Sequence, residues 1–225
     1  MGKAKVIIGI PIHNDLESLR ENIKSIYNTT EFPFEIVLVE SNSIDGCKDY
    51  CNYLSLIYPN IRHLEVNTKT PLEAYNYLFE LAIKEEKDLL LSQTDIIYHK
   101  LYKNDWLKWL YTLSHVDGVS ISTSLNGGGF SGEDYIKGFY WVGGWCTYIP
   151  FKTLKELKGF DINFPNGYGV DIDFSYRASK LGNIMRIEYY PNHHMQNERL
   201  HDKDPNTEQM KQDSSKYFKQ KWQLS

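Results

Sequence analysis

Short continuous apolar runs alternate with segments of helical periodicity over the first hundred residues. The runs cover residues 6–10, 34–39, 61–66 and 89–91, and between them apolar residues recur every three or four positions. Continuous apolar runs are typical of strands buried on both faces, and the three-to-four spacing is typical of helices. The pattern predicts four strands alternating with three helices, which is the order of an α/β fold with a mostly parallel sheet.

Residues 101–190 are less regular but continue the mixture of helices and strands. Helical spacing predicts helices at 106–113 and 171–181, and apolar runs predict strands at 118–123 and 184–189. Between them lies an aromatic, glycine-rich stretch at 139–149, which suggests strands with a close backbone approach.

Polar side chains follow three of the predicted strands. His13 and Asn14 come after the first strand, residues 40–45 after the second and residues 93–95 after the fourth. In a parallel α/β sheet, ligands bind beyond the carboxyl ends of the strands. Strand ends are also polar in many proteins without a site there, so this pattern alone leaves the function open.

Composition narrows the functional classes. The net charge of −4 over 225 residues lacks the basic footprint of a nucleic-acid-binding protein. Three cysteines are too few for a disulfide framework, so we expect a reducing, cytoplasmic setting, with Cys47 and Cys51 serving in packing. No apolar run reaches spanning length, so we expect no transmembrane segment; peripheral attachment to a membrane stays open.

Several common catalytic motifs are absent. The glycines at 127–129 do not lie between a strand and a helix, as a phosphate-binding loop requires, and no serine hydrolase elbow occurs. Carboxylates and histidines at strand ends therefore remain as the candidate chemistry.

Six segments, in order along the chain, resemble the inverting family-2 glycosyltransferases of the GT-A fold. The resemblance covers about residues 5–194. The matching segments are an apolar strand with proline and asparagine at 6–14, a strand with an acidic loop at 35–45, Ala74-Tyr-Asn76, a strand ending in Gln-Thr-Asp at 89–95, Gly159-Phe-Asp161, and the helix start Asp171-Ile-Asp at 171–173.

The resemblance implies a single α/β domain of the GT-A (Rossmann-like) type. It implies transfer of a sugar, with inversion, from a nucleoside-diphosphate sugar to a hydroxyl acceptor on a glycan, lipid or protein. We expect the domain at 1–190, with a nucleotide-sugar-binding half at 1–100 and an acceptor-binding half at 101–190. A C-terminal tail at 191–225 is expected to pack on or near the active site, and a homodimer stays open.

The resemblance also implies roles for individual residues. Asp171 is the expected general base, and Asp95 is the expected ligand of a divalent metal, Mn²⁺ or Mg²⁺, with His194 preferred to His193 as a further ligand. The residues expected to bind the nucleotide sugar are Pro11, His13, Asn14, Glu40, Asn42, Asp45, Asn76, Gln93, Thr94 and Asp95. The residues expected to bind the acceptor are Trp141, Gly143, Trp145 and Asp173.

Each of these residues also has a purely structural interpretation. Asp45 fits a helix cap equally well, and Asp171 and Asp173 fit carboxylates favoured at a helix start by the macrodipole. Asp173, two residues after Asp171, would point elsewhere and would cap or orient instead. A histidine pair before a polar tail is also typical of an exposed surface.

Two departures from the family pattern keep rival functions open. Gln93 stands where the family usually has Asp, and Val170 stands where it usually has Glu. A sugar-nucleotide-binding pseudoenzyme is therefore one alternative. A nucleotidyltransferase is another, although His13, Asn14 and Asp15 occupy the place where such an enzyme would carry a basic glycine-rich loop.

Overall fold

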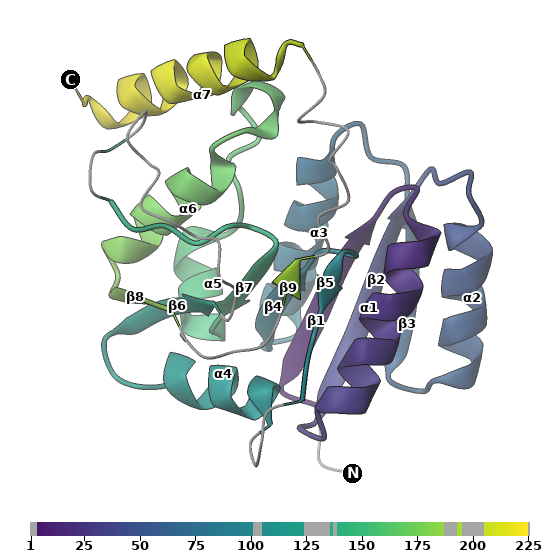
Figure 1. The fold of residues 1–225 in the computed structure, drawn as a ribbon. Helices are drawn as coiled ribbons and strands as arrows, with labels where there is room; N and C mark the ends of the chain where they lie inside the picture. Colours follow the sequence, from purple (N-terminus) through teal and green to yellow (C-terminus); the bar gives the residue numbers. More distant parts are fainter. Residues whose placement is uncertain are drawn as a thin grey trace.

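A seven-stranded sheet runs through the molecule in the order β3-β2-β1-β4-β7-β6-β8 (Figure 1). The computed structural model describes residues 4–100, 105–123, 136, 139–186, 193–194 and 205–224. The strands are β1 (Val6–Ile12), β2 (Phe34–Ser41), β3 (Ile61–Val66), β4 (Asp88–Ser92), β6 (Val119–Thr123), β7 (Cys146–Ile149) and β8 (Asn183–Arg186). All neighbours pair in parallel except β7, which is antiparallel to both β4 and β6. The mostly parallel α/β sheet expected from the sequence is confirmed.

Helices cover both faces of this sheet. The helices are α1 (Leu16–Thr29), α2 (Cys47–Ile57), α3 (Pro71–Lys84), α4 (Trp106–Ser114), α5 (Phe151–Leu157), α6 (Val170–Ser179) and α7 (Thr207–Trp222), with a short 3₁₀ turn, η2, at Pro165–Gly167. One buried apolar cluster contains side chains of α1, α2 and α4, and a second contains side chains of α3, α5, α6 and α7.

Alternation along β1 explains how one strand supplies both clusters. Ile8 and Ile10 belong to the first cluster and Ile7 to the second. At Gly9, an added Cβ would lie 2.9 Å from the Leu78 side chain of α3. The glycine therefore allows α3 to pack directly on the centre of the sheet.

A second, two-stranded sheet joins a late part of the chain to the end of β4. It consists of β5 (Ile96–Ile97) and β9 (His193–His194), which pair antiparallel with Ile96 opposite His194. The segment that carries both histidines therefore runs beside the turn that carries Asp95.

The second half differs from the sequence expectation in two places. Of the stretch at 139–149, only Cys146–Ile149 forms a strand, and the tail contains a 16-residue helix, α7. The glycines at 127–129 lie outside the described residues. No helix within the described ranges is long and apolar enough to span a bilayer.

The cysteines serve in packing, as expected. Cys47, Cys51 and Cys146 are free and fully buried. Burial raises the pKa of Cys47 and of Cys51 to about 12, so neither thiol is a ready nucleophile.

Candidate active site

The loops that follow β1 and β2 form one hydrogen-bonded unit at the carboxyl end of the sheet. The His13 ring, through Nδ1, lies 2.7 Å from the Ser41 carbonyl oxygen. The backbone N–H of Asn14 donates to Ser43 Oγ at 3.1 Å, and Asn14 Oδ1 accepts from the Ile44 backbone N–H at 2.7 Å. Asn14 has φ 48°, a left-handed conformation that asparagine tolerates well. His13 and Asn14 thus lie beside the β2 loop, as the sequence predicted.

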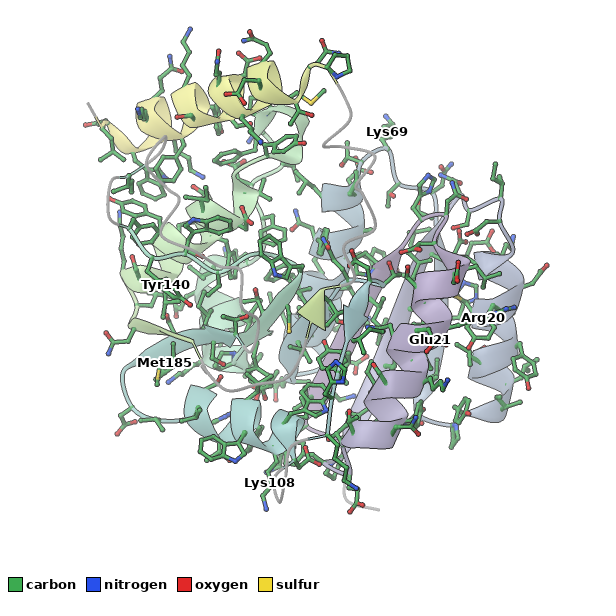
Figure 2. All side chains as sticks on the ribbon, in the orientation of Figure 1. Arg20, Glu21, Lys69, Lys108, Tyr140 and Met185 are labelled. Atoms are coloured by element: carbon green, nitrogen blue, oxygen red, sulfur yellow. The ribbon has the colours of Figure 1, made fainter. Side chains whose placement is uncertain are left out.

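Figure 2 shows both ends of the sheet. Lys69, which follows β3, marks the carboxyl end of the parallel strands, and Lys108 of α4 lies at the opposite end. The candidate site residues of β1, β2 and β4 are on the Lys69 side.

Glu40 is a buried carboxylate at the end of β2. Its side chain is 1% exposed, and Glu40 Oε1 accepts the Ser43 backbone N–H at 2.6 Å. Two residues on, Asn42 has φ 53°, and its Nδ2 donates to Asn67 Oδ1 at 3.1 Å. Glu40 therefore shapes the turn of the β2 loop, next to Ile12 of β1 in the sheet register. Pro11, the preceding residue of β1, pairs with Val39.

Asp45 connects the starts of two helices. Its carboxylate accepts the backbone N–H of Leu16, at the start of α1, at 2.9 Å and that of Cys47, at the start of α2, at 3.1 Å. Burial pushes the pKa of Asp45 upward, but the hydrogen bonds from Cys47 and Leu16 outweigh it and leave that pKa below its usual range. The geometry favours the helix-capping interpretation of Asp45.

The turn after β4 is held from three directions. The Gln93 backbone N–H donates to the Trp145 carbonyl at 2.9 Å, and Gln93 Nε2 donates to the Tyr75 hydroxyl at 2.8 Å. Thr94 Oγ1 donates to Asp15 Oδ2 at 2.5 Å, which joins this turn to the β1 loop. Asp95, directly after Thr94, therefore lies in a turn fixed to β1 and to the segment before β7.

Asn22 of α1 also holds this turn, a role that was not predicted from the sequence. It is fully buried, and its Nδ2 lies 2.7 Å from the Ile96 carbonyl and 3.2 Å from the Gln93 carbonyl. The available signal was an amide on the apolar face of α1, next to Ile23. Carbonyls inside a tight turn need such a donor when they are buried.

Asp171 lies at the start of α6, beside the aromatic stretch. Its Oδ2 accepts the Gly144 backbone N–H at 3.4 Å, and its Oδ1 accepts the Ile172 N–H at 2.9 Å. Because Trp145 follows Gly144 and binds Gln93, a short hydrogen-bonded path joins the Asp95 turn to Asp171.

The aromatic stretch folds back on itself next to Asp171 and brings together Trp141, Gly143 and Trp145. A Cβ on Gly143 would lie 2.2 Å from the Trp145 ring, so the indole occupies the space above the glycine. The two tryptophan rings meet edge to face with centroids 6.0 Å apart. This places the predicted acceptor residues together, next to the predicted base.

The side-chain contacts of Asp173 and Asn76 indicate structural roles. Asp173 is fully buried, and its oxygens bind Arg177, Lys221 and Trp222, which favours the orienting role over acceptor contact. Both polar atoms of the Asn76 side chain bind the backbone of one residue, Phe160. Its Nδ2 donates to the Phe160 carbonyl at 2.9 Å and its Oδ1 accepts the Phe160 N–H at 2.8 Å, so it clamps the Gly159-Phe-Asp161 segment onto α3.

The residues near Asp95 are of types that bind divalent cations in proteins. Asp95 offers carboxylate oxygen, and β9 brings His193 and His194 beside β5, directly after Asp95. Carboxylate oxygen suits Mn²⁺ or Mg²⁺, especially with phosphate oxygens as further ligands. Among the described side chains, which do not include those of His193 and His194, no group of three metal-ligating residues occurs.

A family model described as "Glycosyl transferase family 2" matches residues 7–111. No curated protein matches the chain. Among solved structures, the mannosyltransferase PcManGT from Pyrobaculum calidifontis in complex with GDP-Man and Mn²⁺ has a TM-score of 0.64 at 14% identity, with 83% of this chain and 55% of that chain covered.

Two further structures share the fold. TarS 1-349 of S. aureus in complex with UDP-GlcNAc has a TM-score of 0.60 at 17% identity, with 87% of this chain and 62% of that chain covered. GalNAc-T7 with UDP, GalNAc and Mn²⁺ has a TM-score of 0.64 at 13% identity, with coverages of 83% and 43%. This chain thus spans about half the length of these structures, and at such identities the likeness concerns the fold.

Proposed function

We propose that the chain belongs to glycosyl transferase family 2, whose model matches residues 7–111, and that it transfers a sugar from a nucleoside-diphosphate sugar to a hydroxyl acceptor, with inversion at the anomeric carbon. The GT-A fold, which the chain shares with the solved glycosyltransferases, supports this proposal. The acceptor hydroxyl belongs to a glycan, a lipid or a protein. The reaction is a single displacement in which the nucleoside diphosphate leaves.

One observation carries this proposal. Glu40, Asp95 and Asp171 are far apart in sequence, yet a continuous hydrogen-bonded rim links the segments that bear them. The rim runs from the β2 loop to the β1 loop, then to the turn after β4, then through residues 144–145 to α6. Acidic groups gathered along one rim from separate elements suit a single charged ligand with a bound cation.

The donor end of the rim is formed by the loops after β1, β2 and β4. Glu40 and the β2 loop would hold the nucleoside, and His13 and Asn14 lie beside that loop. Asp95, with His194 or His193, would hold Mn²⁺ or Mg²⁺ together with the diphosphate. When bound, the ion neutralises the charge that develops on the leaving diphosphate.

The acceptor end is formed by α6 and the Trp141–Trp145 group. Asp171 accepts the proton of the attacking hydroxyl, which makes the oxygen a better nucleophile as the sugar–phosphate bond breaks. The hydrogen bonds from Gly144 and Ile172 orient the Asp171 carboxylate. Trp141 and Trp145 would provide flat apolar surfaces for the acceptor.

The test is Asp171→Asn, which keeps the shape of the side chain and removes its basicity. We expect transfer to fall by roughly two to four orders of magnitude, because a positioned base contributes about that much. Donor affinity should stay within about twofold, since donor and base lie at different ends of the rim. Calorimetry with a panel of sugar nucleotides and Mn²⁺ gives the affinity, and a coupled assay of nucleoside diphosphate release gives the rate.

Asp49→Asn is the matched control, because Asp49 is an exposed first-turn aspartate of α2. Near-normal turnover in Asp171→Asn would remove Asp171 as the base. A wild-type protein that binds the donor but neither transfers nor slowly hydrolyses it would be a sugar-nucleotide-binding pseudoenzyme. Release of pyrophosphate from a nucleoside triphosphate would instead identify a nucleotidyltransferase.

The pseudoenzyme alternative has one structural observation in its favour. Val170 is 7% exposed and belongs to the apolar cluster on the α3 side of the sheet, so its site offers no carboxylate. The hydrolysis measurement above separates the two functions directly.

A further inference from the structure

Helix α7 packs against η2 and, through aromatic side chains, against α6 (Figure 1). Phe218 is fully buried, and the Tyr176 ring of α6 meets Phe218 and Trp222 edge to face at centroid distances of 5.7 and 4.9 Å. The last helix is therefore part of the core around α6.

At the centre of this contact lies a buried carboxylate, Asp173. Arg177 Nε donates to its Oδ2 at 2.9 Å within α6. Lys221 and Trp222 of α7 contact its Oδ1, with Nζ at 2.8 Å and the indole N–H donating at 2.9 Å. A fully buried carboxylate is costly unless charges and hydrogen bonds surround it, so Asp173 depends on α7 for two of these three partners.

Lys221 also binds a second carboxylate, Asp161. Its Nζ donates to Asp161 Oδ2 at 2.7 Å, and Tyr217 donates to the same oxygen at 3.1 Å. Burial opposes ionisation, but the Lys221 ammonium outweighs it and lowers the pKa of Asp161 to about 2. Asp161 belongs to the segment that Asn76 clamps onto α3, so Lys221 ties α6 to the rest of the domain.

The four charged side chains at this contact carry no net charge. Two carboxylates, Asp161 and Asp173, are matched by two cations, Arg177 and Lys221, and Arg177 further donates to the Leu157 and Gly159 carbonyls at 2.8 and 2.7 Å. Loss of Lys221 would leave the buried group with a net negative charge and Asp173 short of a partner.

We propose that Lys221, together with Trp222, is a positioning residue for Asp171, because it fixes the N-terminal turn of α6 through Asp173. This inference rests on the proposed function. Asp171 and Asp173 lie in the same first turn of α6, so a tilt or fraying of that turn moves the base relative to Gly144 and the acceptor. The donor-binding loops belong to β1, β2 and β4 and make their contacts independently of α7.

The experiment compares Lys221→Met with Lys221→Arg and with Lys216→Met, an exposed lysine on the same helix. Lys221→Met should lower kcat for transfer by roughly 10- to 100-fold, because displacement of a reacting group by about 1 Å costs that much. The donor KM should stay within about twofold of wild type. Lys221→Arg should restore most of kcat, and Lys216→Met should match wild type.

Hydrogen exchange supplies a readout that does not need activity. In Lys221→Met, exchange should rise in residues 169–175 and stay unchanged in residues 6–12 and 34–41. Trp222→Phe, which keeps the ring and removes the indole donor, should show the same pattern more weakly and serves if Lys221→Met does not fold.

The outcomes separate the inference from the proposed function. Equal kcat and equal exchange in Lys221→Met and wild type would overturn the inference, as would a loss of donor affinity in parallel with kcat. If the wild-type protein transfers no sugar, the proposed function fails. Unchanged hydrogen exchange in residues 169–175 of Lys221→Met would then also overturn the inference that Lys221 fixes the N-terminal turn of α6.

Discussion

Single residues divide into those whose role follows from sequence and those whose role depends on tertiary contacts. Asp171 and Asp95 lie where strand and helix order predicted them. Asn22 could not be recognised, because an amide on an apolar helix face acquires its meaning only from the carbonyls that fold against it. Asp173 belongs to the same class, because its partners Lys221 and Trp222 come almost 50 residues later in the chain.

At the residue scale, the adjacent glycines 143 and 144 give a matched pair of tests. Gly143→Ala should destabilise the protein by about 1–3 kcal/mol, because its Cβ would lie 2.2 Å from the Trp145 ring and force the indole away. Gly144→Ala should be close to neutral in stability, since its nearest contact is 3.5 Å. Urea unfolding followed by tryptophan fluorescence measures both, and equal losses in the two variants would contradict the described packing of Trp145.

At the scale of elements, the buried strands were readable because a parallel strand needs apolar side chains on both faces. The aromatic stretch at 139–149 is only partly a strand, because Trp145 folds over Gly143 and only Cys146–Ile149 continues the sheet. The pairing of β5 with β9 was not predictable, because two-residue strands leave no periodic pattern. The sequence therefore located the candidate site at the loops after β1, β2 and β4. It did not reveal that β9 lies beside β5, next to the Asp95 turn.

Asp105 is the element-scale counterpart of Asp173, since it joins the end of α1 to the start of α4. Its carboxylate accepts five hydrogen bonds, from Thr30 Oγ1 and from the backbone N–H groups of Glu31, Phe32, Leu107 and Lys108. Burial would raise the pKa of Asp105, but these hydrogen bonds outweigh it and hold that pKa below its usual range.

A lowered folded-state pKa means that the ionised carboxylate stabilises the fold above the unfolded pKa, near 4, and loses that effect as the pH falls through the folded pKa. Asp105→Asn should therefore cost about 1–3 kcal/mol at pH 7, and the difference from wild type should shrink at pH 3. Urea titrations at the two pH values measure this. A difference that is the same at both would show that charge plays no part at this junction.

At the scale of the whole molecule, two sub-structures meet at β7. Strands β1, β2 and β4 precede the loops proposed to bind the donor. The part that contains β6, β7, β8 and α5 to α7 carries Asp171, the proposed base, and Lys221, which is proposed to position it. The antiparallel β7 pairs with β4, so the two parts form one sheet and the rim crosses their junction.

Ligand binding should therefore stabilise the molecule as a unit. A saturating sugar nucleotide with Mn²⁺ should raise the free energy of unfolding by about 2.7 kcal/mol at a hundredfold excess over Kd. A chelator should remove most of that gain. Asp95→Ala should show the smaller gain with or without the metal, as measured by thermal unfolding. Donor affinity that does not depend on Mn²⁺ in the wild type would count against the metal role of Asp95.

The order of the rim along the chain has a consequence for synthesis on the ribosome. Strands β1 to β4 pair with one another, so a nascent chain of about a hundred residues already contains the loops proposed to bind the donor. β9 and α7 emerge later, and they reach back to the Asp95 turn and to α6 respectively. If the proposed function holds, competence for transfer therefore arises only after β9 and α7 have been made, which keeps shorter nascent chains from consuming activated sugars.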